Sequence, residues 1–202
     1  MFEDHECTDC LLHRNCLHPC LPSIGEGNCK VAIFLDYPVM IEDKRNRSWV
    51  GTNAEFVLWC LKRMGVGSHE IYLDYILKCY PANGTAKKRA ARRELVDACR
   101  CYREASMAEL PECKAVVGLG TLCGEVLTGY SKIGEVEGSF WRPIEPFMRS
   151  RFEHVWIGYN PGYVMEKPGE TGGVYRVLWK ACEEAGLNPV FQKDVKPFNY
   201  PD

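Results

Sequence analysis

The amino-acid sequence predicts an α/β protein in which a mainly parallel sheet lies between two layers of helices. Four short apolar runs, rich in β-branched and aromatic residues, alternate along the chain with segments of helical spacing. Parallel neighbouring strands need a long crossover connection, and a helix between successive strands provides one. We therefore expect a three-layer α/β/α fold around a central four-stranded sheet.

The expected elements follow one another in a regular order. The expected strands span residues 31–35, 71–77, 115–120 and 155–159. The expected helices span 54–64, 90–104, 121–128 and 173–185, and a glycine follows the first and the last of them as a natural stop. Residues 1–29 are rich in Cys, His and Gly without a clear period, so they need a staple such as a metal centre to become ordered. We expect residues 38–51 to form a polar loop and the tail after Pro189 to be irregular.

Composition places the chain among ordinary globular proteins. Its 202 residues are enough for one well-packed domain, which we expect to span 1–202, and 46% of them are hydrophobic. No apolar run approaches the ~20 residues that cross a bilayer, and the acidic, polar N-terminus is unlike a secretory signal. We therefore expect a cytoplasmic monomer without a membrane partner.

Ligands of open parallel sheets bind at the carboxyl ends of the strands. The loops after the first, second and fourth strands, residues 36–51, 79–90 and 160–173, are therefore the expected place of the site. The net charge of −2 does not indicate a generally basic protein, but a local basic patch suffices to hold phosphates. One patch consists of Lys87, Lys88, Arg89, Arg92 and Arg93. By itself this patch is equally compatible with a solvated helix face.

The twelve cysteines are many for a reducing compartment, where metal ligation or burial is favoured over disulfides. Four thiolates can hold zinc or an iron–sulfur cluster. Two sets are available, a compact one and a split one: Cys7, Cys10, Cys16 and Cys20, or Cys7, Cys10, Cys79 and Cys99. Composition does not choose between them. The remaining lone thiols include four that we expect to be small buried hydrophobes: Cys60, Cys113, Cys123 and Cys182. No role follows for Cys29.

The residues around these cysteines resemble the iron–sulfur uracil-DNA glycosylases of the family 4 type. The chain has Cys7-x-x-Cys10-x-Leu-His-Arg, then Gly-x-Gly, then the first strand. Further matches, in the family's order, are Leu-Asp-Tyr-Pro-Val at 35–39, an acidic pair at 42–43, Ser-Trp-Val-Gly at 48–51, Lys-Cys-Tyr-Pro-Ala at 78–82, Glu94 to Cys99, Gly-Leu-Gly at 118–120 and Asn-Pro-Gly at 160–162. The resemblance covers residues 7–185.

This resemblance implies a DNA glycosylase with DNA as its partner and a [4Fe–4S] cluster held by Cys7, Cys10, Cys79 and Cys99. The cluster would be structural and would place the basic patch beside the DNA, which favours phosphate contacts by Lys87, Lys88, Arg89, Arg92 and Arg93. Gly162 and Tyr163, in the last motif, are also expected to contact DNA.

The pocket residues depart from the family's pattern. Asp36 keeps a carboxylate where the family has Glu, and Asn160 replaces the His of the last motif; we expect these two to be catalytic. The base would be bound by Tyr37, Trp49, Tyr75 and Asp74. Trp49 replaces a stacking Phe, and Tyr75 replaces an Asn that reads the base edge, a task for which a phenol lacks the paired donor and acceptor. The structural alternatives are a strand-end cap for Asp36, packing for Trp49 and a turn for Asn160.

The sequence thus leaves three functions open. The first is a glycosylase that excises a flipped, modified non-uracil base, in repair, phage base hypermodification or defence against modified phage DNA. The second is a non-catalytic DNA-binding or replication-accessory protein of the same fold. The third is an unrelated protein knotted by zinc, which requires Cys16 and Cys20 as ligands.

Overall fold

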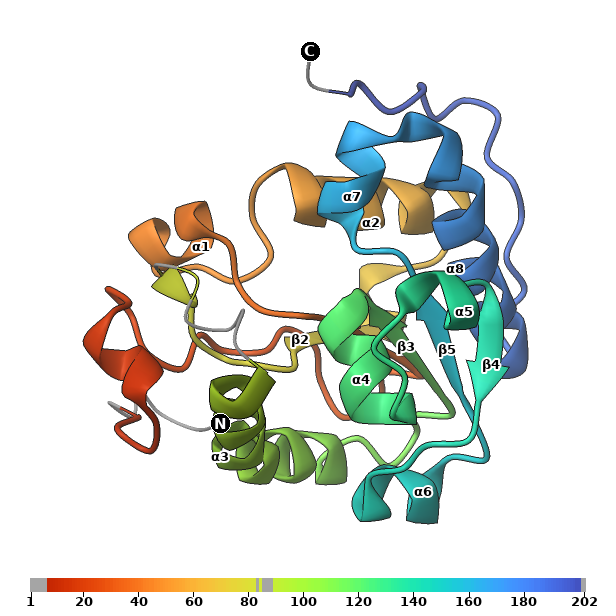
Figure 1. The fold of residues 1–202 in the computed structure, drawn as a ribbon. Coiled ribbons are helices and arrows are strands. Elements are labelled where there is room, and N and C mark those ends of the chain that lie inside the picture. The colour runs from red at the N-terminus through yellow and green to blue at the C-terminus, as the bar shows by residue number, and fades with distance from the viewer. Residues whose placement is uncertain (1–6, 83, 85–88, 201–202) are drawn as a thin grey trace.

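A computed structural model describes residues 7–82, 84 and 89–200, with residues 89–91 described by their backbone alone (Figure 1). It contains a five-stranded sheet in the order β2-β1-β3-β5-β4. The strands are β1 (Val31–Leu35), β2 (Ile71–Tyr75), β3 (Ala115–Leu119), β4 (Ser139–Trp141) and β5 (Val155–Gly158). All neighbours pair in parallel except β4, which runs antiparallel to β5 at the edge.

Helices surround this sheet. The α-helices are α1 (Met40–Arg45), α2 (Thr52–Arg63), α3 (Arg89–Ala108), α4 (Thr121–Thr128), α5 (Ile133–Val136), α6 (Pro146–Arg151), α7 (Pro161–Glu166) and α8 (Thr171–Glu184). Short 3-10 helices are η1 (Leu11–Arg14), η2 (Ser68–Glu70) and η4 (Pro168–Glu170). None of the helices in the described part of the chain has the length and apolar character that a membrane span requires.

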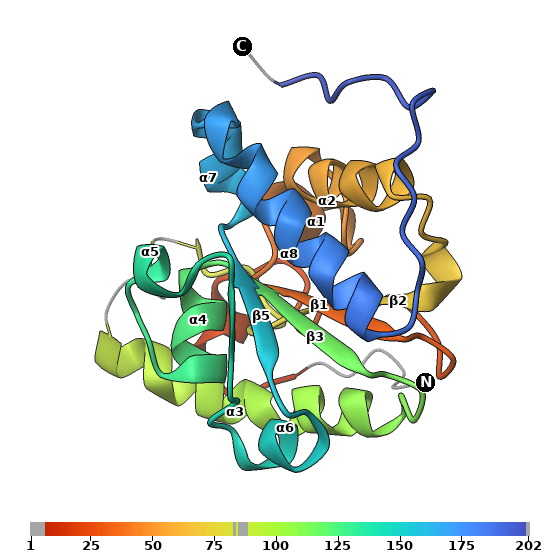
Figure 2. The same cartoon turned by 90° about the vertical axis from the view of Figure 1, so that its right-hand side faces the viewer.

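Alternation along the strands creates two hydrophobic cores, one on each face of the sheet. In β1, Val31, Ile33 and Leu35 pack with residues of α2 and α8, whereas Ala32 and Phe34 pack with residues of α3 and α4. Figure 2 shows α8 crossing one face of the sheet, with α3 and α4 on the other side. Every residue of β1, β2 and β3 is buried, as expected of strands covered on both faces.

The structure confirms the predicted fold class, and it corrects the number of strands from four to five. The missed strand, β4, has three residues and is largely exposed, so it lacks the apolar run by which a buried strand is found. The expected polar loop at 38–51 contains α1, and the loop after β5 contains α7 and η4. Each of these missed elements is six residues or shorter, too short to show a helical period.

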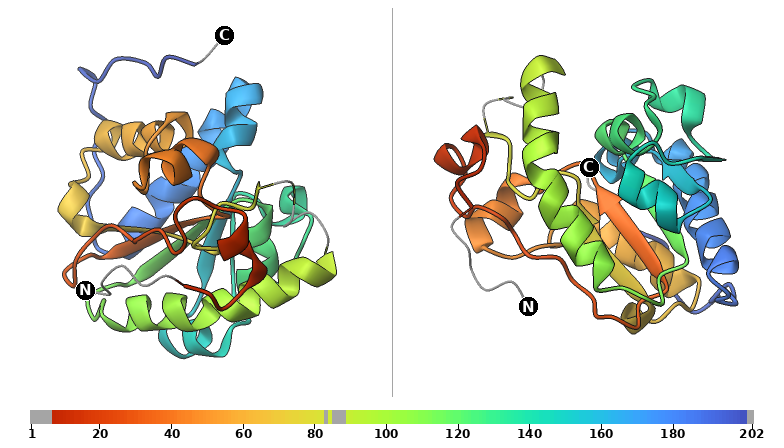
Figure 3. Two further views of the ribbon diagram at one scale, coloured as in Figure 1. Left: turned by 90° about the vertical axis from the view of Figure 1, so that its left-hand side faces the viewer. Right: turned by 90° about the horizontal axis from the view of Figure 1, so that it is seen from below.

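The Cys-rich N-terminal segment lies against β2, α1 and α3 (Figure 3). Ile24 exchanges backbone hydrogen bonds with Leu73, and the Leu21 N–H donates to the Lys78 carbonyl at 2.9 Å. Asp43 of α1 is buried, and its carboxylate accepts the N–H groups of Leu17 at 3.0 Å and of His18 at 2.8 Å. These contacts fix the segment to the parts of the fold that carry the later cysteines.

Replacing Asp43 with Ala should therefore destabilise the protein by about 2 kcal/mol, because two backbone donors lose a charged acceptor. Urea unfolding measures this change, and Glu153→Ala is a matched control because Glu153 is exposed. Equal stability of the two variants would contradict the role assigned to Asp43.

Candidate active site

The side chain of Asp36 follows β1 directly and is buried against the start of α4. Its Oδ1 atom accepts the Cys123 N–H at 2.9 Å. A helix N-terminus offers unpaired N–H groups and the positive end of the helix dipole, both of which stabilise an anion. Gly120, at a φ of +136°, precedes this helix, and a Cβ there would lie 2.3 Å from both oxygens of Asp36. Only glycine therefore allows this close approach of the carboxylate to the backbone.

Asn160 follows β5 and reaches the same place. Its Oδ1 accepts the Gly162 N–H at 2.8 Å, which caps α7 and fixes the orientation of the carboxamide. The side chain of Asn160 forms a hydrogen bond with that of Asp36, and this bond lowers the pKa of Asp36. Because β1 and β5 both neighbour β3, their carboxyl ends bring together two residues that are far apart in the sequence.

Burial raises the pKa of Asp36 to about 6, and hydrogen bonds from Cys123, Leu122 and Asn160 counteract part of this rise. At neutral pH the side chain is then mostly ionised, yet it stays close to its protonation point. A carboxylate in this state can orient a water molecule or stabilise a neighbouring positive charge.

Tyr37 lies beside this carboxylate and is exposed. Burial of the hydroxyl and the Asp36 charge raise the pKa of Tyr37, whereas the Arg92 charge lowers it. The side chains of Tyr37 and Arg92 therefore both border the site.

Trp49 and Tyr75 lie in the core behind the α1 loop. Their rings are 5.9 Å apart, and the exposed fraction of Trp49 is 4%. The Tyr75 hydroxyl donates to Glu42 at 2.6 Å and accepts the Trp49 N–H at 2.8 Å, so both of its hydrogen-bonding functions are used. Glu42 also accepts the N–H groups of Val39 and Val50. In this arrangement the two aromatic rings support the loop between β1 and α2.

Asp74 points to the opposite face of the sheet from Tyr75. It is fully buried, and it accepts from Lys78 Nζ at 2.6 Å, from the Tyr72 hydroxyl at 3.0 Å and from the Tyr75 N–H at 2.8 Å. Its carboxylate is thus held by partners within the protein. Sequence reasoning placed Asp74 at the base, and the structure places it in a buried ion pair beneath the N-terminal segment.

One polar neighbour of the site escaped the sequence analysis. A Cβ on Gly162 would lie 3.1 Å from Asn160 Oδ1 and 3.4 Å from Asn53 Nδ2, so two carboxamides flank this glycine. Asn53 lies in the first turn of α2, directly after the Ser-Trp-Val-Gly motif. That position after a recognised motif was the signal that could have found it.

The structure describes the side chains of only two residues of the basic patch. Lys87 and Lys88 lie outside the described residues, as does the side chain of Arg89. Arg92 forms an ion pair with Glu125 at 3.0 Å, whereas Arg93 is exposed.

Tyr163 lies across the site, on α7. Its ring is 4.8 Å from that of Tyr159, and Lys167 Nζ lies 5.0 Å from the ring centroid. Aromatic rings beside a cation form a surface of the kind that binds nucleic-acid strands.

Thiols from the N-terminal segment and α3 lie near the loop after β2, where burial and the charges of Cys16, Cys99 and Cys10 raise the pKa of Cys79. Cys7, Cys79 and Cys99 are buried. Burial, together with the neighbouring Cys10 and Cys7, raises the pKa of Cys99 to about 12. The Cys20 N–H donates to Cys79 Sγ at 3.2 Å.

Among the described residues, no three His, Cys, Asp or Glu side chains are placed to hold a single metal ion. A four-iron cluster has a different requirement, because each thiolate bonds to a different iron atom. Its four sulfurs are consequently spread more widely than the ligands of one zinc ion. The thiols of Cys7, Cys10, Cys79 and Cys99 lie close enough for their charges to act on one another, and four thiols are the donor set that such a cluster uses.

The fold and the site define an α/β protein with a buried carboxylate and a carboxamide at the carboxyl ends of its parallel strands. No known family profile matches the chain. It is 26% identical over 171 residues to a type-4 uracil-DNA glycosylase of Pyrobaculum aerophilum, which covers 82% of this chain and 83% of the relative. It is 31% identical over 91 residues to a type-4 uracil-DNA glycosylase of Thermotoga maritima, across 43% of this chain and 46% of the relative. The chain thus resembles the type-4 members of the uracil-DNA glycosylase superfamily, with divergent site motifs.

The buried Asp36 should cost the protein stability whenever it is ionised. At pH 8, Asp36→Asn should raise the free energy of unfolding by up to about 3 kcal/mol, because the pKa is near 3.8 in the unfolded chain and about 6 in the folded one. This gain in stability should decline as the pH falls through 6 and vanish below about pH 4, where Asp36 is protonated in both the folded and the unfolded chain.

Urea unfolding of the wild type and Asp36→Asn at pH 8 and at about pH 4 tests this expectation. The exposed Asp194→Asn is the control and should show no such dependence on pH. A variant that is less stable than the wild type at pH 8 would refute the burial argument for Asp36.

Proposed function

We propose that this protein is a DNA N-glycosylase, which hydrolyses the N-glycosidic bond of a base flipped out of DNA. The observation that carries the proposal is the contact between Asp36 and Asn160 at the carboxyl ends of β1 and β5. A hydrolase of this kind needs a carboxylate near the sugar and a donor near the leaving base, and this pair supplies both. The two type-4 relatives, which are named for this activity, support it.

The two side chains have complementary tasks in the proposed reaction. Asp36 orients a water molecule whose oxygen bonds to C1′, and its negative charge stabilises the oxocarbenium-like sugar. As the C1′–N bond breaks, its electron pair passes to the base. Asn160 Nδ2 donates a hydrogen bond to a base carbonyl oxygen where this charge builds, but a neutral carboxamide has no proton to give. The proton of the water therefore passes to Asp36, and the departing base is later protonated from solvent.

The proposed substrate is a modified base other than uracil. Reading the uracil edge requires an adjacent donor and acceptor, as in an amide. Tyr75 stands at the corresponding position, and its hydroxyl is already bonded to Glu42 and to the Trp49 backbone. Tyr37, which is larger than the family's residue, borders the site in addition. These differences favour a base whose recognition does not depend on the uracil edge.

The proposed cofactor is a structural [4Fe–4S] cluster held by Cys7, Cys10, Cys79 and Cys99. Three of these thiols are buried, and Cys79 accepts a backbone N–H, which stabilises a thiolate. When bound, the cluster would covalently tie the N-terminal segment to α3 and thereby order the region from which the basic patch extends. The compact zinc set is the weaker alternative: Cys16 lies near Cys10 and Cys20 near Cys7, but no three of the described thiols are placed to hold one metal ion.

The same fold without catalysis, as a DNA-binding or replication-accessory protein, is the second candidate function. The replacement of the family's His by Asn160 is the observation that favours it, since a proton donor near the base is lost. Either function makes DNA the partner, and we propose that the protein acts as a monomer.

Base release from duplexes carrying a panel of modified pyrimidines tests the catalytic proposal. The wild type should release at least one modified base, and Asp36→Ala should lower kcat/KM by about 10²-fold or more. Below its plateau, kcat/KM should fall as the pH drops through about 6, because Asp36 then becomes protonated.

Two results would contradict parts of this proposal. Strong activity on plain uracil alone, abolished in Asp36→Ala, would refute the assignment of a modified base. Salt-dependent DNA binding without release of any base would favour the non-catalytic function.

Cysteine variants distinguish the two metal assignments. Cys99→Ser should lose iron and the brown absorbance at about 400 nm, whereas Cys20→Ser and the control Cys113→Ser should keep both. Colourless protein with stoichiometric zinc, lost in Cys20→Ser and kept in Cys99→Ser, would replace the cluster by the compact zinc site.

A further inference from the structure

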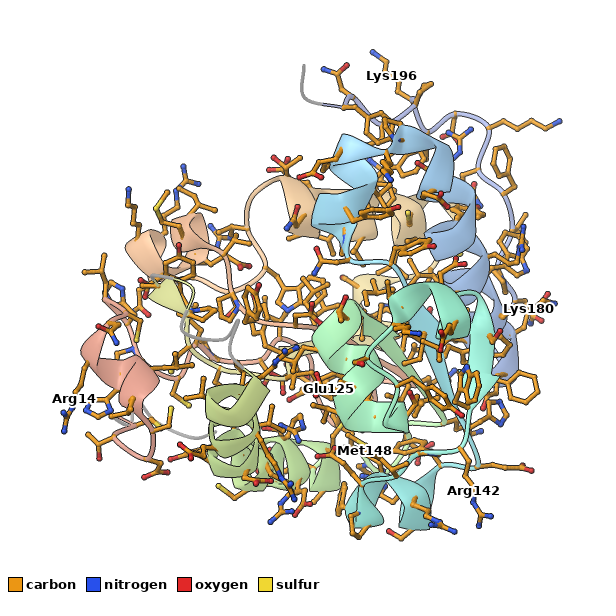
Figure 4. All side chains as sticks on the ribbon, viewed as in Figure 1. Arg14, Glu125, Arg142, Met148, Lys180 and Lys196 are labelled. Carbon is orange, nitrogen blue, oxygen red and sulfur yellow. The ribbon has the colours of Figure 1, made fainter. Side chains whose placement is uncertain are left out.

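A groove of about 690 Å³ lies between α3 and α4. This volume is within the range of about 300–1,000 Å³ that is typical of ligand sites and far exceeds the size of one base. Figure 4 labels Glu125, one of its lining residues, between the two helices. Neither the proposed reaction nor the proposed cluster uses this groove.

One end of the groove adjoins the candidate active site. Leu122 lines the groove, and its backbone N–H hydrogen-bonds to the Asp36 carboxylate. Arg92 also lines it, and its charge acts on the hydroxyl of Tyr37. In the proposal below, a group attached to a base beside Asp36 enters the groove at this end.

The groove has an apolar lining with charges along it. The apolar residues are Val96, Leu122, Val126 and Ile144. Ile144 is 51% exposed, so its aliphatic side chain is accessible to a ligand in the groove. This lining suits the methylene groups of a chain-like ligand.

The charges of the lining are balanced. Three arginines stand against three carboxylates: Arg92, Arg93 and Arg100 against Asp97, Glu125 and Glu145. Although Arg92 and Arg93 belong to the basic patch expected to contact phosphates, the three carboxylates beside them would repel a DNA strand, which carries a negative charge on every phosphate. A largely aliphatic ligand with a single polar end matches it better.

Donors for that polar end are present on α3. Glu125 pairs with Arg92, and Glu145 pairs with the buried Arg103, whereas Arg93 and Arg100 extend along the exposed side of the groove. In the described part of the chain, Arg92 Nε is buried without a hydrogen-bond partner. These guanidinium groups favour an acceptor oxygen at the end of the ligand.

We propose that the groove holds a substituent of the target base, a chain several atoms long that is aliphatic along its length and ends in a carboxylate. This inference rests on the proposed glycosylase function and names its substrate class, a pyrimidine that carries such a chain at C5.

Binding of free nucleosides tests the groove separately from catalysis. The probes are 5-(5-carboxypentyl)-2′-deoxyuridine, its 5-hexyl analogue and unsubstituted deoxyuridine, each titrated calorimetrically into the full-length protein. Ile144→Trp, which fills the groove from an exposed position, should weaken binding of both substituted nucleosides by at least about tenfold. Arg100→Gln should weaken binding of the carboxypentyl nucleoside alone.

The matched controls are Val190→Trp and Arg149→Gln, which replace exposed residues outside the groove and should leave both affinities unchanged. In parallel, base release is measured from duplexes that carry the same three nucleosides. Wild type should release the substituted bases, and Ile144→Trp should impair this release selectively.

The outcomes separate the two proposals. Groove-dependent binding without release of any base would uphold the groove and refute the glycosylase function. Release of small bases without binding of the substituted nucleosides, or with equal effects of Ile144→Trp and Val190→Trp, would refute the groove as the substituent site and leave the glycosylase function standing. If the protein neither binds the substituted nucleosides nor releases any base, both proposals are refuted.

Discussion

The close packing of the Asp36 carboxylate on Gly120 and the first turn of α4 is the interaction on which the site depends. It requires a glycine at a φ of +136°, a helix that starts directly after β3 and a neighbouring strand end that delivers Asn160. The helix N-terminus and the carboxamide partly offset the cost of burying the charge, and the pKa still rises to about 6. Such an energetically costly group, held in place by three elements, is characteristic of functional sites.

The acidic residues near the site have different tasks, although the sequence shows them as similar. Glu42 and Asp43 are neighbours in α1, yet Glu42 organises the loop between β1 and α2, while Asp43 holds the N-terminal segment. The Asp74 carboxylate forms a buried ion pair with Lys78. Among these carboxylates Asp36 contacts Asn160, and it adjoins the groove between α3 and α4 through Leu122. Burial and hydrogen-bond partners, which depend on the fold, separate a chemical role from a structural one.

The proposed function and the groove together give a consistent account of the divergent motifs. In the proposals, Tyr75 cannot read the base edge as an amide would, and a groove with balanced charge beside Asp36 recognises the base through an attached chain instead. Cys99 lies on α3, the helix that forms one wall of that groove. In the two proposals, different residues of this helix thus hold the cluster and line the substituent site.

The sequence by itself determined the fold class, the four buried strands and the longer helices, because hydrophobic period and glycine stops are local properties of the chain. It also indicated Asp36, Asn160 and the cysteines through their places in ordered motifs. Tertiary structure decided the rest. The elements of six residues or fewer, the burial of Trp49 and Tyr75, and the arrival of Asn53 beside Asn160 depend on contacts between segments distant in the chain. A side chain's partners are set by packing across the sheet, and no local pattern records them.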